Sequence, residues 1–368
     1  MILDGFAPDS IALAVERVRA GGLVGLPTET VYGLAADADN ATAVGKIFAA
    51  KGRPADHPLI VHVSDAASAM HFASRVPEFA RRLMVAFWPG PLTLILHRRH
   101  SVAAAAAGGQ DSIGLRCPAH PVAQALLRAC YESNAQMAHG SMPIWGLAAP
   151  SANQFGRVSP TTAQHVASEF DSGLLILDGG ACSVGIESTI IDCTRGAPVL
   201  LRPGAIRLEQ VQTVCGQKAF LMEEFVSAQA ARPRASGTLV SHYAPRAQVR
   251  LMGARDMQTA LDVLAGVPEP GSSASTSMAI YSRSALRNRS AHVVTRRMPD
   301  DAAATAQQLF AVLREFDRQG VRLIWIETPP DGPEWDGVRD RLQRAAATDG
   351  QAVQSGADQT KAPPERGF

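Results

Sequence analysis

Two cations lie two residues apart in the segment Lys51-Gly52-Arg53-Pro54. The lysine stands out because the chain holds only four lysines among its 35 basic residues. A guanidinium can bind phosphate oxygens through two parallel hydrogen bonds, and an ammonium adds a compact positive charge. Two such groups could equally do no more than complement the dipole at the end of a helix. The segment therefore indicates either a polyphosphate site or an ordinary helix terminus.

Polar clusters also follow several apolar runs that predict strands. Arg116 lies inside such a run, where it either pairs with an internal carboxylate or binds an anion. Ser159 is either a ligand-binding hydroxyl or only the N-cap of the next helix. Open α/β sheets bind ligands at the carboxyl ends of their strands, so one polar pocket accounts for the clusters together. Its cations would be Lys51, Arg53, Arg116 and Arg202. The clusters cover 27–33, 111–118, 149–153, 185–189 and 201–204.

Alternating helices and strands over 1–212 must position these clusters. Apolar residues at helical spacing predict a first helix, with Ser10 as its N-cap and Gly21-Gly22 as its end. Helices interleaved with short strands and bounded by Gly and Pro are typical of an α/β domain. Further helices are predicted around 44–48, 79–87 and 121–130, and strands over 23–26, 59–63, 92–96, 113–117, 174–177, 189–191 and 199–201.

The pattern loosens over 213–247, where Pro, Gly, Ser and Arg replace periodic apolar residues. We expect a linker there. A second, smaller α/β unit is predicted over 248–347, and the composition of 348–368 predicts a disordered tail. The unit's strands are predicted over 249–252, 278–281, 292–294 and 321–326, its helices near 256–265, 301–319 and 333–347, and a surface loop over 268–277.

Composition narrows the class of protein. The chain has 368 residues, 46% of them hydrophobic, which is enough for about two domains with their own cores. A net charge of +1 excludes a uniformly basic nucleic-acid coat, so any polyanion site must be local. Five cysteines without a C-x-x-C pair predict neither a disulfide framework nor a zinc cluster. With no signal peptide and no long apolar run, we expect a cytoplasmic protein without a membrane span.

The common nucleotide motifs are missing, since neither G-x-x-x-x-G-K-[ST] nor G-x-G-x-x-G follows a predicted strand. A different series occurs in order: PTETVYGL, KGRP with HPLIVH, FWPGPLTLIL, GLRCP, APSAN, GIESTI and LRPG. This series resembles the YrdC-type domain of threonylcarbamoyl-AMP synthases, and the later SHYAP with the small α/β unit resembles their long two-domain form. The resemblance implies a twisted mixed sheet with helices and a concave basic pocket, joined by a linker to a smaller Rossmann-like domain.

The resemblance also implies an activity. The enzyme would make L-threonylcarbamoyladenylate from L-threonine, bicarbonate or CO2, and ATP, with release of pyrophosphate. Mg²⁺ would be the cofactor, held mainly by the phosphates of ATP rather than by the protein. The product would pass to the tRNA threonylcarbamoyl transfer machinery, with direct tRNA contact left open and no membrane involved.

Individual roles follow from the same resemblance. Lys51, Arg53 and Arg116 would be the catalytic cations, because the reaction needs no protein nucleophile but must neutralise charge on the leaving group. Tyr243 of the linker would fold over the nucleotide. The residues around threonine would be Thr30, His62, Arg116, Ala149 and Ser188. Those around ATP would be Lys51, Arg53, His57, Ser112, Ser151, Asn153, Ser159, Arg202 and Tyr243.

Two other functions compete with this one. A non-catalytic RNA- or nucleotide-binding module could use the same basic concavity, but the near-neutral charge and the lack of aromatic stacking motifs oppose it. A carbamoyltransferase with a similar domain would also carry an acylphosphatase-like unit and Cys-rich zinc motifs. This chain has neither, so the sequence favours the synthase.

Overall fold

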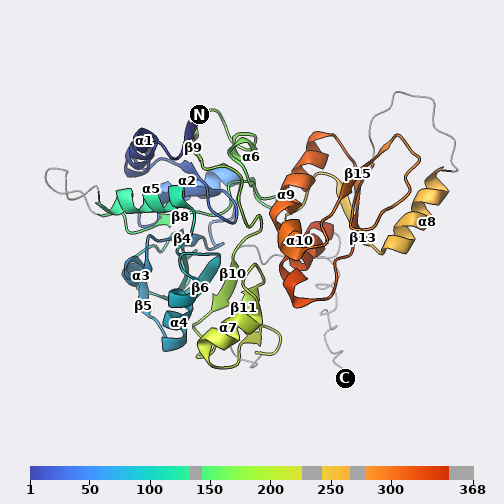
Figure 1. Cartoon of the computed structure of the whole chain (residues 1–368). Coiled ribbons are helices and arrows are strands. Elements are labelled where there is room, and N and C mark those ends of the chain that lie inside the picture. The colour runs from blue at the N-terminus through green and yellow to red at the C-terminus, as the bar shows by residue number, and fades with distance from the viewer. Residues whose placement is uncertain (133–142, 226–242, 266–277, 348–368) are drawn as a thin grey trace, which may run out of the picture.

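Two α/β units make up the part of the chain that the computed structural model describes, residues 1–132, 143–225, 243–265 and 278–347. The first unit carries a mixed 12-stranded sheet, and the second a 4-stranded sheet whose strands are all parallel. In Figure 1, helices α9 (Ala302–Arg318) and α10 (Asp336–Ala346) lie between the small sheet and the first unit. The predicted fold class, a mixed sheet followed by a smaller α/β domain, is confirmed.

The large sheet mixes parallel and antiparallel neighbours. Its strands β2, β4 and β10 are buried along their whole length, as expected for strands covered on both faces. In sheet order the strands are β1 (Ile2–Asp4), β9 (Leu175–Asp178), β2 (Val24–Leu26), β3 (Gly33–Asp37), β8 (Leu147–Ala148), β4 (Ile60–His62), β7 (Ser112–Arg116), β6 (Leu92–Arg98), β10 (Thr189–Asp192), β11 (Val199–Arg202) and β12 (Phe220–Leu221), with β5 (Ala73–Arg75) paired to β6.

Seven helices of the first unit are described, and their ends follow local chemistry. The first begins at Pro8, because proline is preorganised for a first turn, and the prediction of Ser10 as its N-cap is wrong. The second is capped at its start by Asn40. Its last residue is Lys51, because the following Gly52 adopts a left-handed conformation, with φ of 61°, that ends the helix. The helices are α1 (Pro8–Arg19), α2 (Ala41–Lys51), α3 (Ala66–Phe72), α4 (Glu78–Phe87), α5 (Pro121–Glu132), α6 (Ala163–Ala167) and α7 (Leu208–Cys215).

The second unit is a parallel sheet with helical crossovers, the arrangement predicted from its alternating pattern. Asp301 caps α9 by accepting a hydrogen bond from the backbone of Ala304. In sheet order the strands are β13 (Gln248–Met252), β16 (Leu323–Glu327), β14 (Met278–Ser282) and β15 (Val293–Arg297). The remaining helices are α8 (Ala254–Ala265) and the short 3-10 turn Pro333–Trp335.

The first unit extends further than the predicted boundary at 212. Helix α7 continues to Cys215, and Val211 and Cys215 are both buried in the core of the first unit. Strand β12 then pairs with β11, so the sheet extends to Leu221. Strand β12 is only two residues long, so no local pattern in the sequence shows it. Much of the predicted linker, the 268–277 loop and the 348–368 tail lie outside the described residues.

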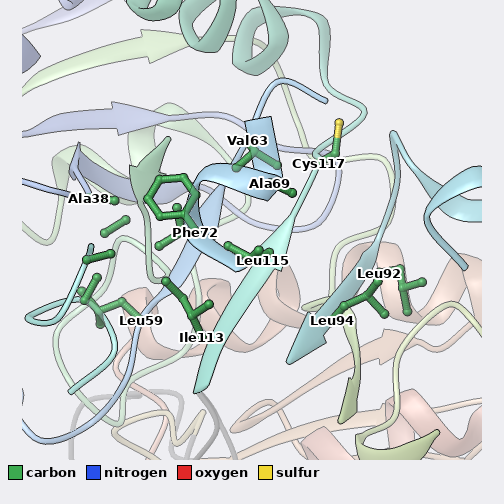
Figure 2. Packing of buried hydrophobic residues seen from close by; sticks show 14 of the residues in the cluster. Ala38, Leu59, Val63, Ala69, Phe72, Leu92, Leu94, Ile113, Leu115 and Cys117 are labelled. Atoms are coloured by element: carbon green, nitrogen blue, oxygen red, sulfur yellow. The ribbon is translucent and has the colours of Figure 1, made fainter. Parts of the chain in front are cut away.

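Two buried clusters position the site. Figure 2 shows part of the first, in which Phe72, Ile113 and Leu115 pack around β4 and β7. The second crosses between the units, since Ile186 of the first unit shares a cluster with Phe310 of α9. The units therefore share one core where they meet. In the described ranges, no helix is both long enough and apolar enough to span a membrane.

Candidate active site

A cavity lies at the carboxyl ends of β4 and β7. These strands are parallel neighbours, with His62 directly opposite Arg116. The strand-end placement predicted for the site therefore brings the two residues together. The lining comprises Thr28, Thr30, Val31, Gly33, Ile60, His62, Arg116, Ala149, Pro150, Ser151, Glu187, Ser188, Arg202 and Tyr243.

Arg116 both pairs with a carboxylate and faces the cavity. Its guanidinium lies 2.7 Å from Glu29 Oε1, and Nη1 donates to Thr30 Oγ1 at 2.8 Å. Only 4% of Arg116 is exposed. The two interpretations left open for Arg116 are thus compatible, because Glu29 holds the arginine while the cavity gives a ligand access to it. Glu29 is a residue that the sequence analysis did not single out, although it lies in the PTETVYGL motif.

His62 lies beside Arg116 in an unusual electrostatic setting. Burial, followed by the nearby positive charge of Arg116, holds the pKa of His62 well below its ordinary value. Its ring is therefore neutral near pH 7. The Nδ1 atom is buried and has no hydrogen-bond partner among the described residues. A neutral ring with an uncommitted nitrogen at a cavity wall can accept or donate a hydrogen bond to a ligand.

Ser188 and Arg202 form another part of the lining. Arg202 donates to the backbone oxygen of Ser188 at 3.0 Å and to its hydroxyl at 3.1 Å. That hydroxyl also lies 2.7 Å from Thr93 Oγ1. Only 2% of Arg202 is exposed, so its charge is held in place at the cavity wall.

Glu187 is a second acidic residue that the sequence analysis did not assign. Burial alone would raise the pKa of Glu187, but Arg341 and Arg202 outweigh it and the pKa is lowered. Ser159 donates its hydroxyl hydrogen to Glu187. The alternative of Ser159 as a helix N-cap is wrong, because Thr162 caps α6. Glu187 could have been noticed only as the charged member of the GIESTI motif.

Lys51 is buried and directed at the backbone rather than at the cavity. Its ammonium donates to the carbonyl of Ser151 at 2.6 Å and to that of Asn153. Burial, and then the charge of Arg53, hold the pKa of Lys51 well below its ordinary value. Asn153 in turn donates to the carbonyls of Gln154 and Arg157. Lys51 thus fixes the loop after β8, and its contact with phosphate stays a prediction.

Three further residues predicted around ATP, Arg53, His57 and Ser112, do not line the cavity. Arg53 donates to the carbonyl of Pro58 at 2.9 Å and lies over the ring of Phe155. Burial lowers the pKa of Arg53 to about 10. The ring of His57 meets that of Phe155 edge-on at 5.5 Å. Ser112 lies at the far end of β7 from Arg116, so the structure does not bring it to the cavity, and these ATP roles stay predictions.

Tyr243 closes the cavity from the linker side. It is 1% exposed and adopts a φ of 61°, an uncommon left-handed conformation for a residue other than glycine. Its ring packs 5.5 Å from that of Phe310, between the units. Burial, together with the charge of Glu187, raises the pKa of Tyr243 to about 12, so the phenol stays protonated near pH 7.

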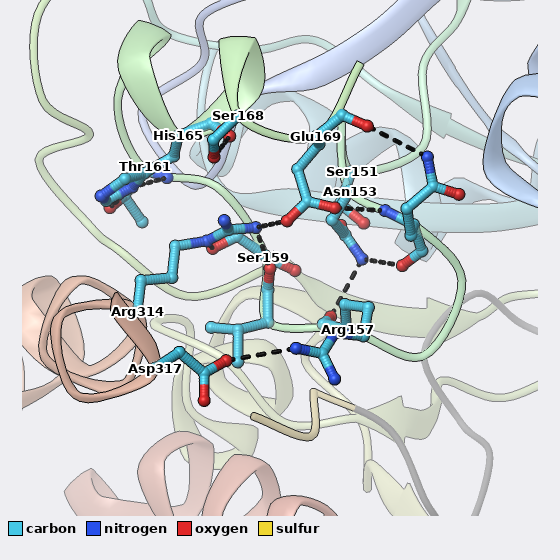
Figure 3. Close-up of polar contacts among 12 residues, drawn as sticks. Ser151, Asn153, Arg157, Ser159, Thr161, His165, Ser168, Glu169, Arg314 and Asp317 are labelled. Atoms are coloured by element: carbon cyan, nitrogen blue, oxygen red, sulfur yellow. Dashed lines mark hydrogen bonds and ion pairs between the residues drawn. The ribbon is translucent and has the colours of Figure 1, made fainter. Parts of the chain in front are cut away.

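Helix α9 holds the loop after β8 from the other side. Figure 3 shows Arg314 paired with Glu169 at 2.8 Å and Asp317 paired with Arg157 at 3.2 Å. Asp317 also accepts the backbone N–H of Arg246, near the end of the predicted linker, at 2.8 Å. The second unit therefore supports both the loop and the end of the linker. No local sequence pattern predicts these contacts, because they join residues far apart in the chain.

The fold and cavity define a class: an α/β enzyme with a basic strand-end pocket that a second α/β unit helps to close. Residues 16–204 match the family model described as telomere recombination. Residues 206–347 match the model described as threonylcarbamoyl-AMP synthase, C-terminal domain. The chain belongs to the threonylcarbamoyl-AMP synthase family.

Relatives cover nearly the whole chain. The threonylcarbamoyl-AMP synthase of Pyrococcus abyssi is 37% identical over 340 residues, which span 91% of this chain and 94% of the relative. The Bacillus subtilis synthase is 36% identical over 346 residues, spanning 91% and 92%. The crystal structure of P. abyssi Sua5 with L-threonine has a TM-score of 0.77 at 35% identity, and covers 91% of this chain and 94% of that one.

Proposed function

We propose that this chain makes L-threonylcarbamoyladenylate from L-threonine, bicarbonate or CO2, and ATP, and releases pyrophosphate. The observation that carries the proposal is the cavity, where Arg116, His62 and Ser188 meet in a chain that resembles a threonine-bound relative over nearly its whole length. The same family membership favours the enzyme over an RNA-binding module or a carbamoyltransferase.

Threonine would bind at the Arg116 side of the cavity. The guanidinium, oriented by Glu29, offers the amino acid's carboxylate a charged donor in a dry setting. Ile60 and Ala149 provide apolar surface for the methyl group. The uncommitted Nδ1 of His62 is available for a further hydrogen bond. These groups together fix the amino acid without a covalent bond to the protein.

The chemistry then needs positioning and charge neutralisation. Threonine's amine loses a proton and bonds to CO2, and an oxygen of the resulting carbamate attacks the α-phosphorus of ATP. The bond from that phosphorus to the bridging oxygen breaks, and pyrophosphate leaves. Arg202, with Arg53 behind it, would offset the negative charge that builds on the phosphates. The phenol of Tyr243, closing the cavity, would keep water from the carbamate and the mixed anhydride.

Magnesium fits this site only as a companion of ATP. Glu187 is the one carboxylate in the described lining, and its oxygens already accept from Ser159 and Arg341. Mg²⁺ usually keeps water and substrate phosphates as ligands, so it would enter on ATP and shield phosphate charge. The protein's own part is to hold the phosphates with arginine.

The test is direct. Purified protein is incubated with ATP, Mg²⁺, bicarbonate and L-threonine, and the products are separated by chromatography. We expect an adenylate and pyrophosphate that both disappear when threonine or bicarbonate is omitted. Product formed without threonine would contradict the proposal. Transfer of the product to tRNA by downstream machinery, and a cytoplasmic location, stay predictions.

A further inference from the structure

Arg341 belongs to α10 in the second unit, but its guanidinium bonds mainly to the first. Nε donates to Glu187 Oε2 at 2.9 Å, and Nη2 donates to the backbone oxygen of Glu187 at 3.0 Å. Nη1 donates to the backbone oxygen of Pro203 at 2.7 Å and to Asp340 at 2.9 Å. The guanidinium also lies 5.4 Å from the centre of the Tyr243 ring. One side chain thus contacts three segments that form the cavity.

The backbone is shaped to allow this reach. Gly337 lies one turn before Arg341 on the same face of α10. A Cβ at Gly337 would lie 2.8 Å from Ile186 Cδ1 and 3.3 Å from the Cα of Gly204, so a larger residue would have to displace the end of the Ile186 side chain and press on the Gly204 backbone. Arg341 is 1% exposed as a result. This close contact is an observation independent of the guanidinium's hydrogen bonds.

The contacted segments carry the residues that face the ligands. Glu187 precedes Ser188, and Pro203 follows Arg202. We propose that Arg341 is a positioning residue for adenylate formation: it fixes these two segments, with Tyr243 against them, in the arrangement that binds ATP and threonine. The inference rests on the proposed function and adds a direct role for the second unit beyond anchoring the linker.

The charges around Glu187 give this role a signature. Among the described residues, Arg341 on α10, Arg202 on β11 and Tyr243 of the linker interact electrostatically with Glu187, and Asp340 on α10 interacts with those three groups. Without Arg341, burial would favour the protonated acid, and the pKa of Glu187 should rise. A protonated Glu187 would hold Ser159 less firmly. Activity of the variant should therefore fall as the pH is lowered, over a range where the wild type changes little.

The experiment compares kcat/KM for adenylate formation between about pH 6 and about pH 9. We expect Arg341→Met to lower kcat/KM at least about tenfold near pH 9, and by a larger factor near pH 6. Arg341→Lys should lose activity with a flatter pH profile, because it keeps the charge but not the planar set of donors. Arg339→Met is the matched control, since the hydrogen bonds of Arg339 stay within the second unit. It should stay within about twofold of the wild type.

Adding Glu187→Gln to Arg341→Met should remove the extra pH dependence of kcat/KM. The double variant should also lose less activity than the sum of the two single losses in free energy predicts. Should Arg341→Met fail to fold in circular dichroism, Arg341→Lys and the double variant carry the test, since neither leaves an unpaired buried carboxylate. An unchanged pH profile and rate, or an equal loss in Arg339→Met, would overturn the inference. Calorimetric measurement of ATP binding distinguishes failure of this inference from failure of the proposed function. If the wild type makes no adenylate, the proposed function is wrong. If the Arg341 variants still bind ATP more weakly than the wild type, the positioning role is supported even then.

Discussion

Both α/β units gather polar side chains at the carboxyl ends of their strands, but with different consequences. In the second unit, Glu327 ends β16 and accepts hydrogen bonds from Ser282 Oγ at 2.6 Å, the backbone of Ser284 at 2.8 Å and Arg283 at 2.9 Å. In the first, His62 Nδ1 has no hydrogen-bond partner among the described residues, and it lines a cavity. A strand end can bind a ligand only where polar groups without hydrogen-bond partners in the protein lie beside a cavity.

The first unit's cavity and the Glu327 cluster of the second unit also differ in their balance of positive and negative charge. The described lining of the first unit's cavity holds two buried arginines, Arg116 and Arg202, and one carboxylate, Glu187. In the second unit, Arg283 and Glu327 pair one to one. A surplus of buried positive charge favours an anionic ligand, whereas a matched pair needs none. The first cluster is thus expected to matter for activity and the second for stability.

The largest effect on activity is expected for Arg116→Lys. Lysine keeps a charge near Glu29 but cannot reproduce the planar donors that reach a carboxylate and Thr30 together. We expect kcat/KM for threonine to fall about a hundredfold, at roughly 1.5 to 3 kcal/mol for each charged hydrogen bond weakened. Initial rates at varied threonine and varied ATP measure it. A rise in KM of equal size for both substrates would place Arg116 at the phosphates instead.

A smaller loss is expected for Lys51→Met. The change removes the hydrogen bonds to the carbonyls of Ser151 and Asn153, so the loop after β8 should shift while the buried helix face stays filled. We expect about tenfold lower kcat/KM, mostly through the KM for ATP. Lys46→Met is the control, because Lys46 lies on the same helix and donates to Gly21 far from the cavity. Equal losses in both variants would mean that only the helix is affected.

A smaller effect on activity is expected for substitutions of Tyr243. Tyr243→Ala removes the ring that packs on Phe310 and closes the cavity, so the KM for ATP should rise about fivefold to tenfold. Tyr243→Phe keeps the ring and should stay within about threefold of the wild type. With the pKa of the phenol raised to about 12, neither variant should alter the pH profile below about pH 9. If Tyr243→Ala has no effect on ATP, the linker is only a tether.

Much of this arrangement could be predicted from the sequence, because the motifs lie within a few residues of the strands that carry them. His62 and Arg116 end adjacent strands, and Ser188 directly precedes another, so local patterns placed them at one sheet edge. The short strands β1 and β8 could not be predicted, because two or three apolar residues do not form a pattern. Their place depends on pairing with distant strands.

What the sequence could not show is the contribution of the second unit. Arg341 stands in DGVRDRLQRAA, a run that looks like the exposed face of any charged helix. Only packing against Glu187 reveals that it is buried. The direction of the Lys51 ammonium, toward backbone carbonyls rather than the cavity, was hidden for the same reason. Tertiary contacts decide which charged residues are exposed and which are structural.

The smallest effect on activity is expected for Glu327→Gln, which tests the second half of the comparison. Burial would raise the pKa of Glu327, but the hydrogen bonds from Ser282 and Ser284 and the charge of Arg283 outweigh it, and the pKa is lowered. A carboxyl with a lowered folded-state pKa stabilises the protein above its unfolded pKa of about 4.3 and loses that contribution as the pH falls through the folded value.

Urea unfolding of both proteins at about pH 7 and about pH 3 measures this contribution. Glu327→Gln should unfold about 1 to 2 kcal/mol more easily near pH 7, because glutamine offers one weaker acceptor to three donors. The difference in unfolding free energy should narrow at the lower pH, because the contribution of the wild-type carboxylate is lost as the pH falls through its lowered folded-state pKa. Adenylate formation should stay within about twofold of the wild type, since the cluster lies outside the lining of the cavity. A loss of activity as large as that of Arg116→Lys, without a loss of stability, would show that the two strand-end clusters share one function after all.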